Sequence, residues 1–428
     1  MVDWSARGTE PAEHRVSWGV VAATVMSNAL EFFDFVTYAF FAVYIGKAFF
    51  PGNTPTMSLL LSVGVFGVGF FFRPLGGIVI GAYADRAGRR PAMLLTITLI
   101  TIGTLGLVLT PTYASIGMAA PIIVILCRLI QGFALGGEVG PASAFLIEIA
   151  PPHKRGLYGS WQYATQGLAV FAGGTLGFLL TQVMSTEALA DWGWRLPFLF
   201  GLLLIPVAIY MRRAIPETHR PAQTAGSPAR AKLSDHLGTF ALSIVVIIGG
   251  TVSTYVGTYM TTFAITRLKL PPSSSLEATV VLGLSIFVFS LVGGWLSDHF
   301  GRRVTMIVPR VLLAILIVPG FILLIADPTT INLLLVTGGL SALTAISSGV
   351  SYGIITELFP GSIRASGMSI SNAVGVSIFG GTTQFVVIWL IAETGLETVP
   401  AWYVVITSLI SIVAMLLMPE TRNRELAH

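Results

Sequence analysis

Long apolar runs separated by short polar segments dominate this chain. The runs lie at approximately 18–46, 57–83, 93–110, 119–149, 157–183, 193–212, 237–263, 275–298, 303–325, 331–356, 366–392 and 400–418. Several of them exceed the roughly 18 apolar residues that indicate a membrane-spanning helix. A helix satisfies its own backbone hydrogen bonds in lipid, and the ~10-residue alternation typical of a membrane barrel is not visible. The pattern predicts an all-α membrane protein with twelve transmembrane helices.

The composition supports lipid as the main solvent. Hydrophobic residues make up 54% of the 428 positions, charged residues make up 10%, and the mean hydropathy is +0.82, whereas soluble domains carry about 25% charged residues. The single cysteine, Cys127, excludes a disulfide within the chain and a cysteine-built metal site. The histidines show no metal-binding spacing, so we expect neither a metal nor another cofactor. No signal-peptide pattern precedes the first run.

The basic residues predict how the chain is oriented. If both termini and the even-numbered loops lie in the cytoplasm, only Lys47, Arg267 and Lys269 fall in outer loops, in agreement with the positive-inside rule. The same bias explains the pI near 9.3 without a nucleic acid as partner. We therefore expect a multi-pass protein of the bacterial inner membrane, in contact with lipid, with both termini cytoplasmic and a monomeric state.

The two halves of the chain repeat the same junctions. The segments after the second and the eighth run both read GxxxDxxGRR, a second pair reads ExxPxxxR, and Pro-Glu-Thr occurs at 216–218 and 419–421. The matched residues of the first two pairs are Gly81, Asp85, Gly88, Arg89 and Arg90 with Gly294, Asp298, Gly301, Arg302 and Arg303, and Glu148 and Arg155 with Glu357 and Arg364. The repeat predicts two six-helix bundles, 18–212 and 237–418, with the substrate site between them. We expect cytoplasmic segments at 1–17, 213–236 and 419–428.

These junctions resemble the signature of the major facilitator superfamily. Four further stretches resemble its metabolite:proton symporter family: 72–77 (FRPLGG), 127–133 (CRLIQGF), 136–138 (GGE) and 192–198 (WGWRLPF). The resemblance implies the major facilitator fold and proton-coupled transport, and members of that family carry citrate, tricarballylate, 2-oxoglutarate, shikimate, and proline or betaine. The stretches 27–35 and 81–83 look most like the citrate and tricarballylate branch. The short segment after the twelfth run argues against the osmosensing betaine branch.

The repeated junctions carry the residues of a charge latch. Asp85 would lie at a helix end beside Arg89 and Arg90, while Gly81 and Gly88 permit close backbone approach and a tight turn. Such a latch can hold one access state and release in the other. Ordinary anchoring by positive residues is the alternative. Because the whole motif occurs twice at equivalent positions, we favour gating.

Two arginines within the predicted spans are candidates for substrate binding. Arg128 would lie roughly 14 Å deep at 1.5 Å per residue, where a charge usually faces a cavity or a partner. It could bind a substrate carboxylate or act on the proton carrier, or it could be a structural partner of a carboxylate. Arg73 could form a bidentate pair with a substrate carboxylate, or extend toward the inner interface. Arg310 we interpret as a structural residue near the inner surface.

Three carboxylates are candidates for proton coupling. Glu31 and Asp34 are three residues apart in the first run and share a helix face, and Glu138 lies among glycines in the fourth run. A carboxylate in a low-dielectric site can bind a proton near neutral pH, as a proton-coupled carrier requires. We favour Asp34, with Glu31 and Glu138 as alternatives. A static pairing with Arg128 or Arg73 is the competing interpretation.

Further polar side chains could complete the binding site. For each of them alone, a hydrogen bond between helices is the more common explanation. These candidates are Asn28, Gln162, Gln166, Tyr255, Tyr259 and Asn372.

Together these patterns predict a proton-coupled symporter that imports an organic anion, with a di- or tricarboxylate such as citrate or tricarballylate favoured. Moving an anion inward against the membrane potential costs ~2.3 kcal/mol per charge per 100 mV, and co-transported protons offset that cost. The alternatives are symport of shikimate, 2-oxoglutarate, proline, betaine or an aromatic acid and, less favoured, proton-driven drug efflux. We expect no enzyme, because no phosphate loop, metal cluster or nucleophile elbow is visible.

Overall fold

The computed structural model describes residues 18–52, 55–214, 217 and 232–426. The regular elements of these residues are all helical. In the first part of the chain they are α1 Trp18–Phe40, α2 Ala42–Phe49, α3 Pro55–Ala87, α4 Arg89–Leu109, α5 Tyr113–Ile116, α6 Ala119–Ile149, η1 Pro152–Lys154, α7 Arg155–Val183, α8 Thr186–Asp191, η2 Gly193–Arg195, α9 Leu196–Gly201 and α10 Leu204–Ala214. In the second part they are η3 Leu233–His236, α11 Leu237–Thr266, α12 Pro272–Phe300, α13 Arg302–Ala326, α14 Thr330–Leu358, α15 Arg364–Thr394 and α16 Val399–Leu417. The expected tail at 1–17 and most of the expected linker at 213–236 lie outside the described residues.

Ten of the helices that the structure describes are long and apolar enough to cross a membrane. They match ten of the predicted runs, and several extend a few residues further at their ends. The first run is interrupted at Phe41, between α1 and α2, although the amide N–H groups of Phe41 and Ile45 continue the helical hydrogen bonds at 3.0 Å each. The sixth run is divided among η2, α9 and α10. The apolar pattern locates these two segments but does not reveal their breaks.

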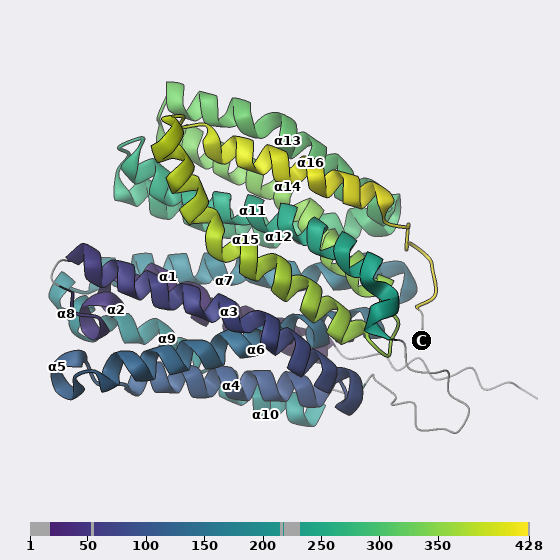
Figure 1. Ribbon diagram of the computed structural model, residues 1–428, viewed down its shortest axis with the longest axis horizontal. Helices are drawn as coiled ribbons and strands as arrows, with labels where there is room; N and C mark the ends of the chain where they lie inside the picture. Colours follow the sequence, from purple (N-terminus) through teal and green to yellow (C-terminus); the bar gives the residue numbers. More distant parts are fainter. Residues whose placement is uncertain (1–17, 53–54, 215–216, 218–231, 427–428) are drawn as a thin grey trace, which may run out of the picture.

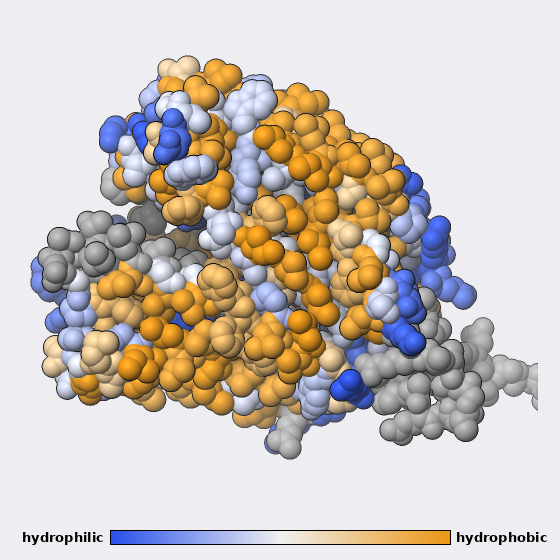
Figure 2. All heavy atoms as spheres, in the orientation of Figure 1, coloured by the Kyte–Doolittle hydropathy of each residue, from blue (hydrophilic) through white to orange (hydrophobic). Residues whose placement is uncertain are grey.

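The helices form two groups that lie side by side (Figure 1). We call α1–α10 the first bundle and α11–α16 the second bundle. Helices α3, α6 and α7 of the first bundle pack against α12, α14 and α15 of the second. The bundles converge at the end that holds the GxxxDxxGRR junctions and the described C-terminal residues, here called the latch end, and diverge at the opposite, far end. Figure 2 shows the surface hollowed between the bundles at the far end.

Apolar side chains cover the outside of both bundles. Large hydrophobic residues such as Phe71, Leu109 and Val183 are 81%, 72% and 76% exposed, and Figure 2 shows hydrophobic residues across most of the visible flank. Soluble monomers rarely expose apolar patches of this extent. The surface therefore fits the lipid environment that the composition predicts.

Close contact between α3 and α6 holds the centre of the first bundle together. A methyl group added to Gly136 would fall 2.5 Å from the Cα of Arg73, and one added to Gly132 would fall 2.8 Å from the Cα of Gly69. Small residues at these steps let two helix backbones approach each other. The packing presses the backbone of Arg73 against α6 in the interior of the protein.

Candidate functional site

At the latch end, the first GxxxDxxGRR junction joins the two bundles. Asp85, near the end of α3, accepts hydrogen bonds from the backbone N–H groups of Ala365 (3.1 Å) and Ser366 (2.8 Å) at the start of α15. Arg89 pairs with Asp85 at 2.6 Å and with Glu148 at 3.0 Å. Helix N-termini present unsatisfied N–H groups and favour a negative charge. The carboxylate of one bundle therefore caps a helix of the other.

The second junction repeats this geometry in the opposite direction. Asp298 accepts from the backbone N–H groups of Gly156 (2.8 Å) and Leu157 (2.9 Å) at the start of α7. Arg302 pairs with Asp298 at 2.7 Å and with Glu357 at 3.2 Å. Each bundle thus supplies one aspartate to the other, as expected for a duplicated latch.

The Pro-Glu-Thr segments support the same junctions. Glu217 accepts from the backbone N–H groups of Arg89 (2.9 Å) and Arg90 (3.2 Å). Glu420 accepts from those of Arg302 and Arg303, both at 3.0 Å. Both glutamates therefore cap the helix that follows a motif glycine. The flanking Pro216 and Thr218 lie outside the described residues.

The motif glycines permit the turns at both junctions. Gly88 has φ +114° and Gly301 has φ +101°, a region that residues with a Cβ rarely adopt. A methyl group on Gly88 would also fall 2.5 Å from the Cδ of Glu217. Each glycine allows the chain to leave one long helix and begin the next within a single residue.

One pair of matched residues differs between the two junctions. Arg364 of the second bundle pairs with Glu148 of the first at 3.0 Å. Its counterpart Arg155 donates instead to the backbone carbonyl of Arg424, beyond α16, at 2.8 Å. The crossing ion pair is therefore formed on one side only among the described residues.

In the interior of the first bundle, Asp34 and Arg128 face each other. They are 4.0 Å apart and both are almost fully buried. Gln131 bridges them, because it accepts from Arg128 (2.7 Å) and donates to Asp34 (2.6 Å), and it also donates to Thr104 (3.0 Å). The Oδ1 atom of Asp34 has no hydrogen-bond partner among the described residues. Arg128 therefore has a carboxylate partner within its own bundle, as one of the two interpretations of this residue anticipated.

Two other acids lie in the same bundle. Glu138 is buried in α6 and accepts a short hydrogen bond from Thr96 of α4, while its second oxygen has no partner in the described part of the chain. Glu31 is also buried. All three carboxylates proposed for proton coupling are thus removed from water.

Asn28 and Gln162 bind each other rather than face an open space. Gln162 donates to the side chain of Asn28 at 3.2 Å, and Asn28 donates to the backbone carbonyl of Gln162 at 3.3 Å and to the hydroxyl of Thr165. Both side chains are 1% exposed. In this conformation they form a hydrogen-bonded link between α1 and α7.

Arg73 lies at the boundary between the bundles and is 5% exposed. Its guanidinium carbon is 4.4 Å from the ring centre of Phe35 and 4.2 Å from that of Phe70, and it interacts with Tyr255 of the second bundle. Its Nε and Nη2 atoms have no hydrogen-bond partner, and the side chain forms no ion pair, among the described residues. A buried guanidinium with unused donors is costly, which keeps Arg73 a candidate for anion binding.

A layer of tyrosines lies next to Arg73 where the bundles meet. Tyr163 of α7 hydrogen-bonds Thr254 of α11 at 2.5 Å, and its ring centre is 5.5 Å from that of Tyr352. Tyr352 donates to Asn372 at 2.9 Å and accepts from Gln166 at 3.5 Å. The Tyr163–Thr254 and Gln166–Tyr352 bonds cross between the bundles. Tyr352 thus joins Gln166 and Asn372 of the predicted site, while Tyr255 packs its ring against Phe70 of α3.

Tyr259 lies apart from this layer. It is 3% exposed in the core of the second bundle, where its ring centre is 6.1 Å from that of Phe263. Its position fits a packing role better than the substrate contact expected from the sequence.

Comparison with known proteins agrees with this architecture. The family model described as Major Facilitator Superfamily matches residues 24–318, and the model described as Sugar (and other) transporter matches residues 236–428. This chain belongs to the major facilitator superfamily. Among solved structures, the proton:xylose symporter XylE bound to 6-bromo-6-deoxy-D-glucose superposes with a TM-score of 0.76 over 95% of this chain and 97% of that one, at 16% identity. The superfamily fold predicted from the repeated junctions is confirmed.

Curated relatives of this major facilitator protein are named as transporters. A citrate-proton symporter of Klebsiella pneumoniae is 35% identical over 401 residues, which cover 92% of this chain and 90% of the relative. An alpha-ketoglutarate permease of Escherichia coli is 33% identical over 96% of this chain and 95% of the relative. A proline/betaine transporter of Salmonella typhimurium is 32% identical over 95% and 84%. The protein is a multi-pass membrane transporter, and the expectation that it is not an enzyme agrees with these relatives.

Two residues of this transporter's interior received no functional role from the sequence. Gln131 is noticed there only as part of a motif, yet it joins Arg128 to Asp34. Arg310 is left there as a structural residue, and its side chain is fully buried within the second bundle. The sequence did hold a signal for Arg310, because no acidic residue occurs in the middle of any span of the second half.

Proposed function

We propose that this protein is a proton-coupled symporter that imports an organic anion with two or three carboxylates, such as citrate or tricarballylate. The observation that carries this proposal is Arg73. Its guanidinium is buried between the bundles with two donors unused and no carboxylate partner among the described residues. A bidentate carboxylate satisfies such a group in geometry and in charge. The citrate-proton symporters among the relatives support the same substrate class.

Asp34 is the residue to which we assign the transported proton. It lies beside Arg128 and Gln131, so loss of its charge changes the balance of a buried ion pair. Protonation releases Arg128 from its partner, and deprotonation restores the pair. Coupling follows if only one of these arrangements accompanies the movement of the loaded carrier. Glu138 and Glu31 are the alternative proton sites, and no cofactor besides the co-transported proton is needed.

We assign the latch end to the cytoplasm of a bacterial inner membrane, with both termini on that side. The basic junctions lie at this end, in agreement with the positive-inside rule. The two aspartate latches are closed there, so the described conformation is closed toward the cytoplasm. Substrate then enters from the far end, and opening of both latches releases it inward. Residues 18–212 and 237–418 act as the two moving units, and a monomer suffices because one chain supplies both.

A zwitterion such as betaine is the second candidate substrate. Its carboxylate would bind Arg73, while the tyrosine layer of Tyr163, Tyr255 and Tyr352 offers ring faces to a quaternary ammonium group. The proline/betaine transporters among the relatives favour this alternative.

Uptake by proteoliposomes tests these assignments. Purified protein is reconstituted and supplied with labelled citrate, with and without an alkaline interior, and unlabelled tricarballylate, 2-oxoglutarate, shikimate, betaine and a cationic dye compete. The proposal expects citrate accumulation that depends on the pH gradient and is blocked by tricarballylate. Accumulation of betaine with no effect of tricarboxylates would select the second candidate. Uptake that is the same with and without the gradient would refute proton coupling.

A further inference from the structure

Arg310 of α13 is a fully buried cation that neutral groups surround. It donates to the backbone carbonyl of Gly249 (2.8 Å) and to the hydroxyls of Ser253 (3.1 Å), Ser347 (3.2 Å) and Ser348 (3.3 Å). None of the ion pairs between described residues includes it. Neutral partners satisfy its hydrogen bonds but leave its charge uncompensated. A buried charge without a counter-charge is expensive and usually marks a functional position.

The second half of the sequence offers Arg310 no acid of its own. Every acidic residue between 237 and 418 lies in the first or last two turns of a helix or between helices: Glu277, Asp298, Asp327, Glu357, Glu393 and Glu397. Asp298 and Glu357 are already bound to Arg302. The counter-charge of Arg310 must therefore come from outside the second bundle.

The three serines that accept hydrogen bonds from Arg310 connect it to different parts of the protein. Ser253 passes its own hydrogen to the carbonyl of Gly249 at 2.7 Å, and Ser347 passes its hydrogen to the carbonyl of Met306 at 2.8 Å. Both bonds end within the second bundle. The Ser348 hydroxyl instead lies beside Gly250. The carbonyl of Gly250 accepts from Thr254 at 2.8 Å, and Thr254 hydrogen-bonds Tyr163 of the first bundle. Ser348 is thus the hydroxyl that connects Arg310 to the boundary where Arg73 and the tyrosines lie.

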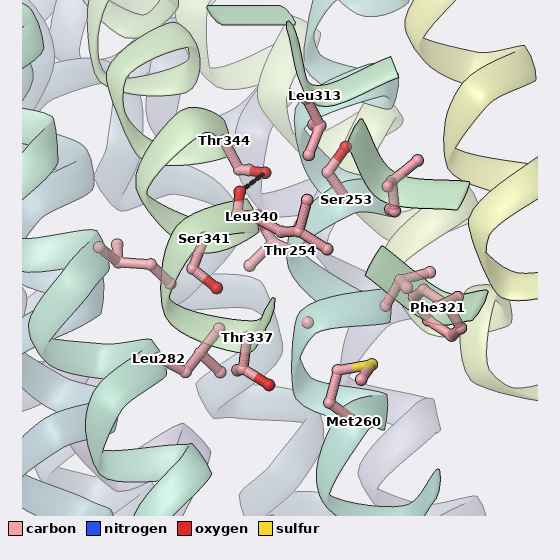
Figure 3. A pocket seen from close by; sticks show the side chains of 14 residues that line it. Ser253, Thr254, Met260, Leu282, Leu313, Phe321, Thr337, Leu340, Ser341 and Thr344 are labelled. Atoms are coloured by element: carbon pink, nitrogen blue, oxygen red, sulfur yellow. Dashed lines mark hydrogen bonds between the residues drawn. The ribbon is translucent and has the colours of Figure 1, made fainter. Parts of the chain in front are cut away.

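The cavity beside Ser253, within the second bundle, is too small for an organic acid. Ser253 and Thr254 line a mostly apolar cavity inside the second bundle, together with Thr337, Ser341 and Thr344 (Figure 3). Its volume is about 20 Å³, which admits water but not a carboxylic acid. An anion that neutralises Arg310 must therefore approach from the boundary between the bundles, past Ser348 and Tyr163.

We propose that Arg310, acting through Ser348, is the positioning residue for a second carboxylate of the transported anion. The first carboxylate binds Arg73 of the first bundle. Tyr352 connects the two ends of this site, because its ring contacts that of Tyr163 and it also interacts with Arg73. A substrate with two carboxylates then bridges the bundles, whereas a monocarboxylate engages only one of them. This inference rests on the proposed function and adds the residues that select for a second carboxylate.

Two neighbouring serines give a matched test. Ser348→Ala and Ser347→Ala each remove one hydroxyl that accepts from Arg310. Ser347 is bound to Met306 within the second bundle, whereas Ser348 lies beside Gly250, next to the Thr254–Tyr163 bond. We expect Ser348→Ala to raise the KM for citrate and succinate about 3- to 10-fold, the range for the net contribution of one ordinary hydrogen bond. Ser347→Ala should change these KM values less than about 2-fold. The KM for a monocarboxylate should be unchanged in both variants, because it does not reach Arg310.

Arg310 itself gives the larger effect. Arg310→Gln should raise the KM for citrate about 10- to 100-fold and abolish the preference for di- and tricarboxylates over monocarboxylates, while Arg310→Lys should restore part of that preference. A purely structural arginine would lower stability and kcat for all substrates alike. If Arg310→Gln does not fold, the serine pair decides the question.

The outcomes separate this inference from the proposed function. Absence of carboxylate transport by the wild-type protein would overturn both. If the wild type does transport carboxylates, two results would overturn the second-carboxylate role alone. One is an equal KM shift in the two serine variants. The other is an Arg310→Gln variant that still prefers di- and tricarboxylates over monocarboxylates.

Discussion

The two bundles have matching ends and different interiors. At the latch end, Asp85 and Asp298 each accept two backbone hydrogen bonds from the other bundle. In the interior, the first bundle buries three carboxylates, whereas the buried charge in the middle of the second is Arg310. Opening and closing of the latch end involves both bundles, so the same junction occurs once in each of them. Proton binding needs acids in one bundle only, so the interiors of the two bundles can differ.

This contrast agrees with our proposal that the first bundle binds the transported proton. Asp34, Gln131 and Arg128 form a connected group on α1 and α6. The hydroxyls of the second bundle carry no charge that could change near neutral pH. If this division is correct, variants of acids in the first bundle affect coupling, while variants of the second bundle affect substrate selection.

The largest effect is expected at Arg73. Arg73→Gln removes the guanidinium that we assign to substrate binding, and a lost charge-assisted, bidentate interaction corresponds to about a 100-fold or greater rise in KM. Initial citrate uptake rates in proteoliposomes measure it. Arg73→Lys keeps the charge but not the fork and should recover only part of the affinity. A wild-type KM in Arg73→Gln would remove the anion site from the first bundle.

Loss of coupling is expected next, at Asp34. Asp34→Asn cannot bind and release a proton, so accumulation driven by a pH gradient should fall about 10-fold or more, because each tenfold of gradient supplies about 1.4 kcal/mol. Exchange of labelled for unlabelled substrate should persist, since it needs no net proton movement. Glu138→Gln, a second buried acid in the same bundle, serves as the comparison and should retain accumulation. The reverse result would transfer the proton to Glu138.

A smaller effect on the transport rate is expected when the matched arginines of the two latches, Arg364 and Arg155, are replaced. Arg364→Ala removes an ion pair that crosses between bundles, whereas Arg155→Ala removes one hydrogen bond to a carbonyl. Breaking the buried pair leaves Glu148 with one cationic partner fewer and weakens the closed state, so we expect transport to slow about 3- to 10-fold. Arg155→Ala should slow it less than about 2-fold. Equal rates for both variants would mean that the difference in pairing has no functional weight.

The sequence predicted the parts that depend on periodicity and on repetition. The run at 119–149 coincides with α6, and both GxxxDxxGRR junctions lie at helix ends where they face the other bundle. These features follow from span length and from a duplicated motif. The breaks in the first and sixth runs could not be predicted, because apolar residues continue through them.

The site was harder to predict than the fold because its residues come from different helices. Hydropathy marks Arg73 and Arg128 as unusual but does not reveal that Arg128 has Asp34 as a partner while Arg73 forms no ion pair among the described residues. Asn28 and Gln162 looked like substrate ligands because each is polar within a span. The structure pairs them with each other. Only the packing of helices distinguishes a polar residue that has a partner from one that still needs it.

The smallest effect is expected at Glu420, which caps the start of α13 beside the second latch. Burial alone would raise the pKa of Glu420, but the backbone N–H groups of Arg303, Arg422 and Arg302, together with the Arg302 charge, hold it below its usual value of 4.5. Its stabilising contribution is therefore complete at neutral pH and is lost as the pH falls below about 4.5. Glu420→Gln keeps the shape but not the charge, so it should lower stability by about 0.5–1 kcal/mol. In thermal melting of the purified protein, the difference from wild type should be present at pH 7 and shrink at pH 4. A difference that grows in acid would show that Glu420 is not held as a carboxylate, and the cap would then contribute only through its neutral hydrogen bonds.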